Sequence, residues 1–136
     1  MLKKFWRLRK KIPESATVAE KAGMLFASGH NCTQAVFVAT TGEEDPRILK
    51  MAEAFGGGIG GAKCLCGAVT GGVMALSIKD RGHLAARLVE EFKQNHRATC
   101  CAALSKSFRW NSREHRENCR RITQETAALT ARLLQE

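Results

Sequence analysis

The stretch from Cys66 to Ile78 contains no charged residue and combines glycine and alanine with aliphatic side chains. A helix that is apolar on all sides must be buried by other elements. Gly67 and Gly71 are four residues apart and therefore share one face, where a second backbone can approach closely. The stretch predicts a buried central helix on which the rest of the chain packs.

Local start and stop signals divide the remaining chain into further helical segments. Thr17 and Glu20 form a capping box, Asn31 can cap the next helix, and Asp45 with Pro46 opens a third. The glycine-rich run 56–61 is poorly suited to any regular element. The expected ranges are 18–29, 32–40, 46–55, 66–78, 82–95 and 112–135, with a short cysteine-containing segment at 99–105.

The composition favours an all-helical fold. Aromatic residues make up only 6% of the 136 residues and tyrosine is absent, so the core must consist mainly of Ala, Leu, Val, Ile and Met. This composition favours close helix packing over a β-sandwich, and the length is typical of one hydrophobic core. We therefore predict an all-α, single-domain bundle of about six or seven helices, with a glycine-rich loop before the helix that begins at Cys66.

Positive charge is concentrated at the N-terminus. The net charge is +9, and the first eleven residues contain no acid and six cations, Lys3, Lys4, Arg7, Arg9, Lys10 and Lys11. We divide the chain into a basic arm, residues 1–12, and a helical cysteine-rich redox domain, residues 13–136. Through residues 1–11 the arm can contact an anionic membrane surface, or it can be a solvated terminus. No apolar segment of a secretory signal follows it, so we expect a cytoplasmic protein.

A second group of cations precedes and enters the last expected helix. Glu114 and Glu117 interrupt it, which is typical of a solvated helix face. We therefore do not expect a nucleic-acid partner. The cations are Arg109, Arg113, Arg116, Arg120 and Arg121.

Six cysteines in 136 residues are the strongest functional signal. In a reducing compartment such enrichment points to metal binding or redox chemistry rather than to structural disulfides. The wide spread argues against a compact zinc knuckle, and the sequence has neither a haem-attachment motif nor the cysteine run of bacterial ferredoxins. The cysteines are Cys32, Cys64, Cys66, Cys100, Cys101 and Cys119.

Cys32 and Cys66 are the candidate catalytic thiols, because both are expected in the first turn of a helix. Unpaired N–H groups and the helix dipole stabilise a thiolate there and lower the pKa of the cysteine. The neighbouring glycines are candidates for contacting a cofactor, since they provide a tight turn, N–H donors and close approach to the thiol. These candidates are Gly57, Gly58, Gly67 and Gly71.

The remaining candidates are histidines and one tryptophan. His30 precedes the first candidate thiol and is expected in a loop or cap. His83, His96 and His115 lie on charged helical faces, where we expect them to be solvated. Trp110 is expected to be a partly buried anchor in the turn before the last helix.

Several motifs occur together in a characteristic order: Asn31-Cys32-x-Gln-Ala-Val, Phe55-Gly-Gly-Gly, Cys66-Gly67-Ala-x-x-Gly71, a cysteine before Leu104, and Cys119. With this order the chain resembles the C_GCAxxG_C_C family over residues 16–134. The resemblance implies a small redox-active bacterial protein. It also implies four family cysteines, namely Cys32, Cys66, one of the pair Cys100 and Cys101, and Cys119. The spacing to Leu104 favours Cys101.

Three functions are consistent with these features. In the first, Cys32, Cys66, Cys101 and Cys119 hold an iron–sulfur cluster for electron transfer or redox sensing. In the second, the thiols cycle between dithiol and disulfide without a metal, with Cys66 or Cys32 attacking. In the third, the cysteines bind structural zinc in an interaction module. Cys64 is then a spare ligand or a resolving thiol. A redox partner protein is expected in either redox function, and the glycine faces could support a homodimer.

Overall fold

The computed structural model describes residues 12–136. The basic arm, with its expected membrane-contacting residues 1–11, lies outside the described residues. Within residues 12–136 the chain is helical and contains no β-strand, which confirms the predicted all-α fold. The helices are α2 (Val18–Ala27), α3 (Cys32–Thr41), α4 (Pro46–Glu53), α5 (Gly67–Ile78), α6 (Ala85–His96), α7 (Cys101–Leu104) and α8 (Arg113–Leu134), with short 3₁₀ turns η1 (Ile59–Gly61) and η2 (Gly82–Leu84).

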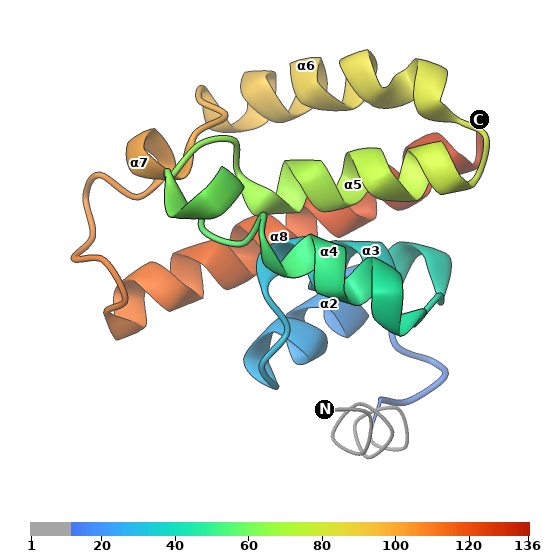
Figure 1. The fold of residues 1–136 in the computed structure, drawn as a ribbon, viewed down its shortest axis with the longest axis horizontal. Coiled ribbons are helices and arrows are strands. Elements are labelled where there is room, and N and C mark those ends of the chain that lie inside the picture. Colours follow the sequence, from blue (N-terminus) through green and yellow to red (C-terminus); the bar gives the residue numbers. More distant parts are fainter. Residues whose placement is uncertain (1–11) are drawn as a thin grey trace.

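The apolar helix α5 lies at the centre of the bundle (Figure 1). It packs against α3 on one side and α6 on another, and the long helix α8 crosses behind it and also contacts α2 and α3. Helix α4 lies on the outside of α3, and α7 lies near the beginning of α5. The predicted role of residues 66–78 as a buried core helix is therefore confirmed.

The helix starts follow the local signals. Thr17 and Glu20 form the predicted capping box of α2, and Asn31 and Gln34 form a second one at α3. Each box satisfies backbone N–H groups that a helix start otherwise leaves unpaired. Gly42 ends α3 in the left-handed conformation, with φ of 72°, which a residue without Cβ adopts at little cost.

The two glycines of α5 allow the close approach that their spacing predicts. A Cβ at Gly71 would collide with the backbone of Thr33, and a Cβ at Gly67 would lie 2.7 Å from the Thr33 hydroxyl oxygen. That hydroxyl donates a buried hydrogen bond of 2.8 Å to the carbonyl of Gly67. The glycine face is thus covered by α3 within the same chain.

The core face of α8 is unusual because three fully buried threonines interrupt its apolar residues. The hydroxyls of Thr123, Thr126 and Thr130 each donate to the carbonyl four residues earlier, at 2.7, 2.7 and 2.8 Å. A buried hydroxyl is costly only when it lacks a partner, so these bonds make the face compatible with the core. Farther along α8, Leu129 and Leu133 pack with leucines of α5 and α6.

Several boundaries differ from the sequence-based expectation: α2 ends at Ala27 rather than at residue 29, α5 begins at Gly67 rather than at Cys66, and the 3₁₀ turn η2 replaces the start of the expected helix 82–95. Helix α4 ends at Glu53 rather than at residue 55, because Ala54 already caps it and the glycine run begins. Part of that run forms the 3₁₀ turn η1, which the glycine composition did not predict. None of the helices within residues 12–136 is both long and apolar enough to cross a membrane.

Candidate functional site

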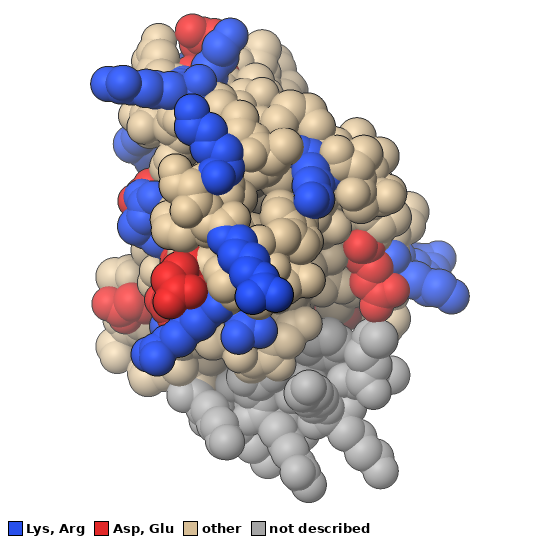
Figure 2. All heavy atoms as spheres, turned by 90° about the vertical axis from the view of Figure 1, so that its left-hand side faces the viewer, with Lys and Arg blue, Asp and Glu red and all other residues tan. Residues whose placement is uncertain are grey.

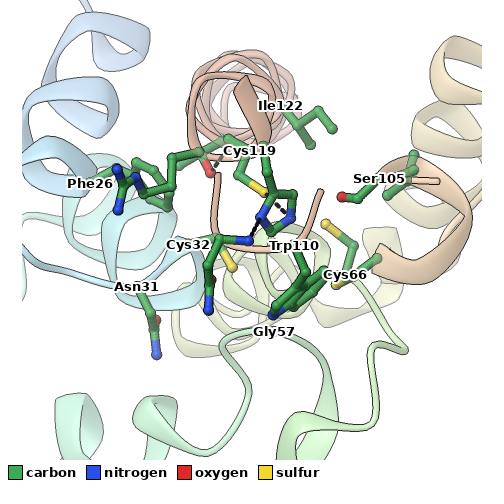
Figure 3. Close-up of a pocket in the computed structure, with 15 residues that line it drawn as sticks. Phe26, Asn31, Cys32, Gly57, Cys66, Ser105, Trp110, Cys119 and Ile122 are labelled. Atoms are coloured by element: carbon green, nitrogen blue, oxygen red, sulfur yellow. Dashed lines mark hydrogen bonds between the residues drawn. The ribbon is translucent and has the colours of Figure 1, made fainter. Parts of the chain in front are cut away.

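A cavity of about 250 Å³ opens at the end of the bundle where α5 begins. Its wall is formed by the beginnings of α3 and α8, the short helix α7, and the turn that precedes α8. Four cysteines line it, and they come from four separate parts of the chain (Figure 3). They are Cys32, Cys66, Cys101 and Cys119, the set that the sequence analysis named.

The rest of the cavity wall is mostly apolar and carries no carboxylate among the described residues that line it. Trp110 lies at the wall as the partly buried anchor that the sequence predicts. Lys63 places its ammonium nitrogen 4.4 Å from the centre of the Trp110 ring, within the range of a cation–π contact. The other lining residues include Phe26, Leu104, Ile122 and Arg116.

Cys32 is the first residue of α3 and is fixed there by Asn31. The Asn31 amide oxygen accepts from the Gln34 N–H at 2.9 Å, while its amide nitrogen donates to the carbonyl of Ala52 at 3.1 Å at the end of α4. Gln34 donates a further hydrogen bond to the carbonyl of Leu49 at 2.9 Å. The Asn-Cys-x-Gln motif therefore joins α3 to α4 and fixes the helix start that carries Cys32.

The expected thiolates at Cys32 and Cys66 are not supported. Burial raises the pKa of Cys32 above its usual value and outweighs the hydrogen bond that the Gly57 N–H donates to its sulfur. The pKa of Cys66 is also raised, first by its hydrogen bond to Cys101 and then by burial. Cys66 is moreover the residue before α5 rather than part of its first turn, and its own N–H donates to the carbonyl of Thr99 at 2.7 Å.

Among the cavity cysteines, Cys101 is the one whose surroundings favour the thiolate. The hydrogen bond from the Cys66 thiol lowers the pKa of Cys101 to about 7, and the N–H groups of Gly67 and of Cys101 itself act in the same direction. Gly67 is the first residue of α5, so the helix start stabilises a thiolate as expected, but on the side chain of a different segment. Sequence spacing alone cannot reveal this, because 34 residues separate the two positions.

Cys119 contacts His115 one turn earlier on α8. The imidazole Nδ1 accepts from the Asn111 N–H at 2.9 Å, which leaves Nε2 as the protonated nitrogen 3.4 Å from the sulfur of Cys119. Burial raises the pKa of Cys119 to about 11, although the Ser105 hydroxyl donates a hydrogen bond to it. The thiol is therefore neutral at physiological pH.

The expectation that His115 is solvated is wrong. Its side chain is buried, its ring lies 4.3 Å from the Trp110 ring, and burial, together with the charge of Lys63, lowers its pKa. The signal that could have found it is the four-residue spacing to Cys119, which places both on one face of a helix. Of the other histidines, His83 is exposed as expected, whereas His96 packs on Phe92 and pairs with Glu125 at 3.2 Å.

His30 lies in the expected loop between α2 and α3, close to the cavity, but it is buried. Burial lowers its pKa to about 4, so its imidazole is neutral at physiological pH.

The two cysteines that do not line the cavity form a disulfide. Cys64 is exposed, Cys100 is half-buried, and the bond joins the loop before α5 to the start of α7. Each of these cysteines neighbours a cavity thiol, since Cys64 precedes Cys66 by two residues and Cys100 directly precedes Cys101. The sequence analysis expected Cys64 to be a spare ligand or a resolving thiol, and it did not identify Cys100 as its disulfide partner.

The four candidate glycines lie in different surroundings. Gly57 lines the cavity, whereas Gly58 packs against the backbone of Lys63, where a Cβ would lie 2.6 Å from the Lys63 nitrogen. Gly67 and Gly71 face α3 inside the bundle. Gly58, Gly67 and Gly71 thus permit close backbone packing, and Gly57 supplies the N–H donor to the Cys32 sulfur.

Across residues 12–136, no three cysteine, histidine or acidic side chains are arranged to hold one metal ion. The four cavity thiols share a wall, but a mononuclear zinc site or an iron–sulfur cluster requires thiolates that converge on the metal. The described arrangement therefore does not fit a preformed metal centre.

A family model described as "Putative redox-active protein (C_GCAxxG_C_C)" matches residues 30–133. The chain belongs to this family. No curated protein and no solved structure matches the chain. The matched range includes all six cysteines and every described element except α2 and the last residue of α8. Within the matched range, Asn31 fixes the helix start that carries Cys32, and Gly67 at the start of α5 donates to Cys101.

Proposed function

We propose that this C_GCAxxG_C_C protein is a thiol–disulfide redox protein in which Cys101 and Cys66 cycle between dithiol and disulfide. The observation that carries the proposal is the placement of the two thiols: Cys66 and Cys101 line the same cavity, are buried in the same apolar cluster, and each affects the pKa of the other. Two neighbouring free thiols in one cavity can form a disulfide when they are oxidised. The family description, a redox-active protein, supports the same class of chemistry.

Cys101 is the attacking group because its pKa of about 7 leaves a large thiolate fraction at neutral pH. Its sulfur attacks one sulfur of a substrate disulfide, forms a mixed disulfide and releases the first substrate thiolate. Cys66, after losing its proton, attacks the Cys101 sulfur, forms the Cys66–Cys101 disulfide and releases the second thiolate. The dithiol loses two electrons and two protons, and the substrate disulfide gains them.

The substrate of this reaction is a small molecule. A cavity of about 250 Å³ with a mostly apolar wall can admit a low-molecular-weight disulfide but not a folded protein segment. Figure 2 shows the end of the molecule that holds α7 and the beginning of α8. Among the charged side chains on this end, lysine and arginine predominate. Such a face attracts anionic substrates.

The test uses oxidation by hydroxyethyl disulfide followed by mass spectrometry of the cysteine-containing peptides. In the wild type we expect a Cys66–Cys101 disulfide. Cys66→Ser should stop at a mixed disulfide on Cys101, and Cys101→Ser should form neither product. Cys119→Ser is the matched control, because it also removes a cavity thiol but should leave the Cys66–Cys101 product unchanged. Oxidation that joins other cysteines in the wild type contradicts the proposal.

A second candidate function is metal binding by Cys32, Cys66, Cys101 and Cys119. The observation in its favour is that these four free thiols line one cavity. Binding an iron–sulfur cluster or zinc would require the side chains to rearrange from their described positions. The visible absorption spectrum and the iron and zinc content of anaerobically purified protein test it. Stoichiometric metal that disappears in Cys101→Ser would favour this candidate over thiol exchange.

A further inference from the structure

Two short segments that each carry two cysteines lie side by side at the cavity. The N–H of Cys66 donates to the carbonyl of Thr99 at 2.7 Å, and the N–H of Ala102 donates to the carbonyl of Lys63 at 3.0 Å. These two backbone hydrogen bonds, together with the Cys64–Cys100 disulfide, fix residues 63–66 against residues 99–102. The arrangement brings four sulfurs into two facing pairs.

The two pairs differ in exposure. In the inner pair, Cys66 is 6% exposed and Cys101 is 9% exposed, and both line the cavity. In the outer pair, Cys64 is exposed and Cys100 is half-buried. A protein dithiol can therefore reach the outer disulfide, whereas the small cavity keeps it from the inner pair.

We propose that the Cys64–Cys100 disulfide is the entry point of a two-disulfide relay, through which an external dithiol protein reduces the Cys66–Cys101 pair. The relay rests on the proposed function. It would return the Cys66–Cys101 pair to the dithiol form after that pair has reduced its substrate. It assigns a role to the two cysteines that lie outside the cavity. It also separates the site for the protein reductant from the site for the small disulfide.

The thiol–disulfide exchange takes place in two stages. First, the external dithiol attacks the outer disulfide through the exposed Cys64, becomes a disulfide itself, and leaves Cys64 and Cys100 as thiols. Second, the Cys64 thiolate attacks the sulfur of Cys101 in the oxidised inner pair, forms a Cys64–Cys101 bond and releases Cys66 as a thiolate. Cys100 then attacks the sulfur of Cys64, restores the outer disulfide and releases Cys101.

The net result is the transfer of two electrons and two protons from the external dithiol to the inner pair. The final state has an outer disulfide and an inner dithiol, which is the state of the structure described here. Every disulfide formed within the chain joins the two facing segments, so no step requires a disulfide between the adjacent residues Cys100 and Cys101. The alternative is that the outer disulfide only fastens the two segments together.

The first experiment compares two reductants on the fully oxidised protein. Dihydrolipoamide coupled to agarose beads reaches only exposed disulfides, whereas dissolved dithiothreitol also enters the cavity. In the wild type we expect the beads to reduce the Cys66–Cys101 pair, measured by alkylation and mass spectrometry. In Cys64→Ser/Cys100→Ser the beads should reduce it at least tenfold more slowly, with the dithiothreitol rate unchanged. Equal bead rates in both proteins overturn the relay.

A second variant tests the relay even if loss of the outer disulfide disturbs folding. In Cys66→Ser the inner thiol of Cys101 can still attack Cys64, but no neighbour can complete the exchange. We expect a fraction of this variant to carry a Cys64–Cys101 disulfide with a free Cys100, detected by mass spectrometry without reduction. Finding only Cys64–Cys100 supports the fastening role. If the wild type never forms a Cys66–Cys101 disulfide, the proposed function itself fails.

Discussion

The two ends of the α5–α8 pair differ in the residues that they bury. At one end, Leu76, Leu88, Leu129 and Leu133 form an aliphatic cluster in which each side chain is at most 9% exposed. At the other end, the same two helices border the cavity with its four thiols. The leucine end contributes apolar burial and needs no specific partner for any atom. At the cavity end, the sulfurs of Cys32, Cys101 and Cys119 accept from donors in other segments, namely Gly57, Gly67 and Ser105.

The difference shows how a small helical protein can combine stability with reactivity. Buried thiols resist ionisation, as the raised pKa values of Cys32 and Cys119 illustrate. Only Cys101 has a lowered pKa, because three donors surround its sulfur. The leucine end allows the cavity end to remain incompletely packed, since the helices are already held together by their other halves.

The largest expected effect is a difference in thiol ionisation within the cavity. Alkylation of Cys101 by iodoacetamide should rise with pH and level off above about pH 7, because the thiolate that reacts forms above the pKa. Cys119, with a pKa of about 11, should have a thiolate fraction at pH 7 that is smaller by roughly three to four orders of magnitude. Peptide mass spectrometry after timed labelling measures both rates.

Cys101→Ser should remove the phase that levels off near neutral pH. If Cys32 or Cys66 instead reacts first at neutral pH, the helix-start expectation is restored and the assignment of Cys101 is wrong.

The next effect concerns the leucine end. Leu88→Ala removes a fully buried side chain and should lower the free energy of unfolding by about 2–5 kcal/mol. It should leave the pH dependence of Cys101 alkylation unchanged, because Leu88 belongs to a different apolar cluster from the one that contains Cys66 and Cys101. Urea denaturation followed by circular dichroism measures the stability. Met51→Ala is the control, since Met51 is 61% exposed and its truncation should change stability by less than about 0.5 kcal/mol.

A shift of the Cys101 alkylation profile in Leu88→Ala would show that the two ends are coupled and would contradict the comparison.

The smallest effect compares two glycines of the same helix. A Cβ at Gly67 would collide with the Cys32 sulfur, and a Cβ at Gly72 would lie 2.6 Å from both a Leu88 methyl carbon and the Thr130 hydroxyl oxygen. Gly67→Ala and Gly72→Ala should each lower stability by about 1–3 kcal/mol through overpacking. Only Gly67→Ala should also change the oxidation rate of the cavity thiols, measured with hydroxyethyl disulfide. An equal change in both variants would mean that the glycine at the helix start has no special role.

The elements of the fold were predictable because their boundaries are set by nearby residues. The capping boxes of α2 and α3, the Asp-Pro start of α4 and the left-handed Gly42 act within one helical turn. The close approach of another backbone to Gly67 and Gly71 was also predicted, but the sequence did not show that α3 supplies this backbone. The exact end of α4 and the turn η1 were not predicted, because glycine permits several conformations at similar cost.

The set of cavity cysteines was predicted only with the help of the family resemblance. Helix-start positions indicated Cys32 and Cys66, and the family pattern added Cys119 and one of Cys100 and Cys101. The structure assigns Cys101 to the cavity and Cys100 to the disulfide with Cys64. Two adjacent residues at the start of a short helix point in different directions, and the sequence does not specify which one faces inward.

By itself the sequence determined the approximate positions of the helices, that α5 is buried, and that thiols dominate the chemistry, because these properties depend on local spacing and composition. Only the tertiary structure decided which thiol ionises, which cysteines form the disulfide and that His115 is buried. Those properties depend on donors and neighbours from remote segments. The N–H of Gly67 acts on Cys101, Thr99 accepts from Cys66, and Lys63 lies over Trp110. Such contacts form only when the helices pack together, so the residue spacing within one segment does not predict them.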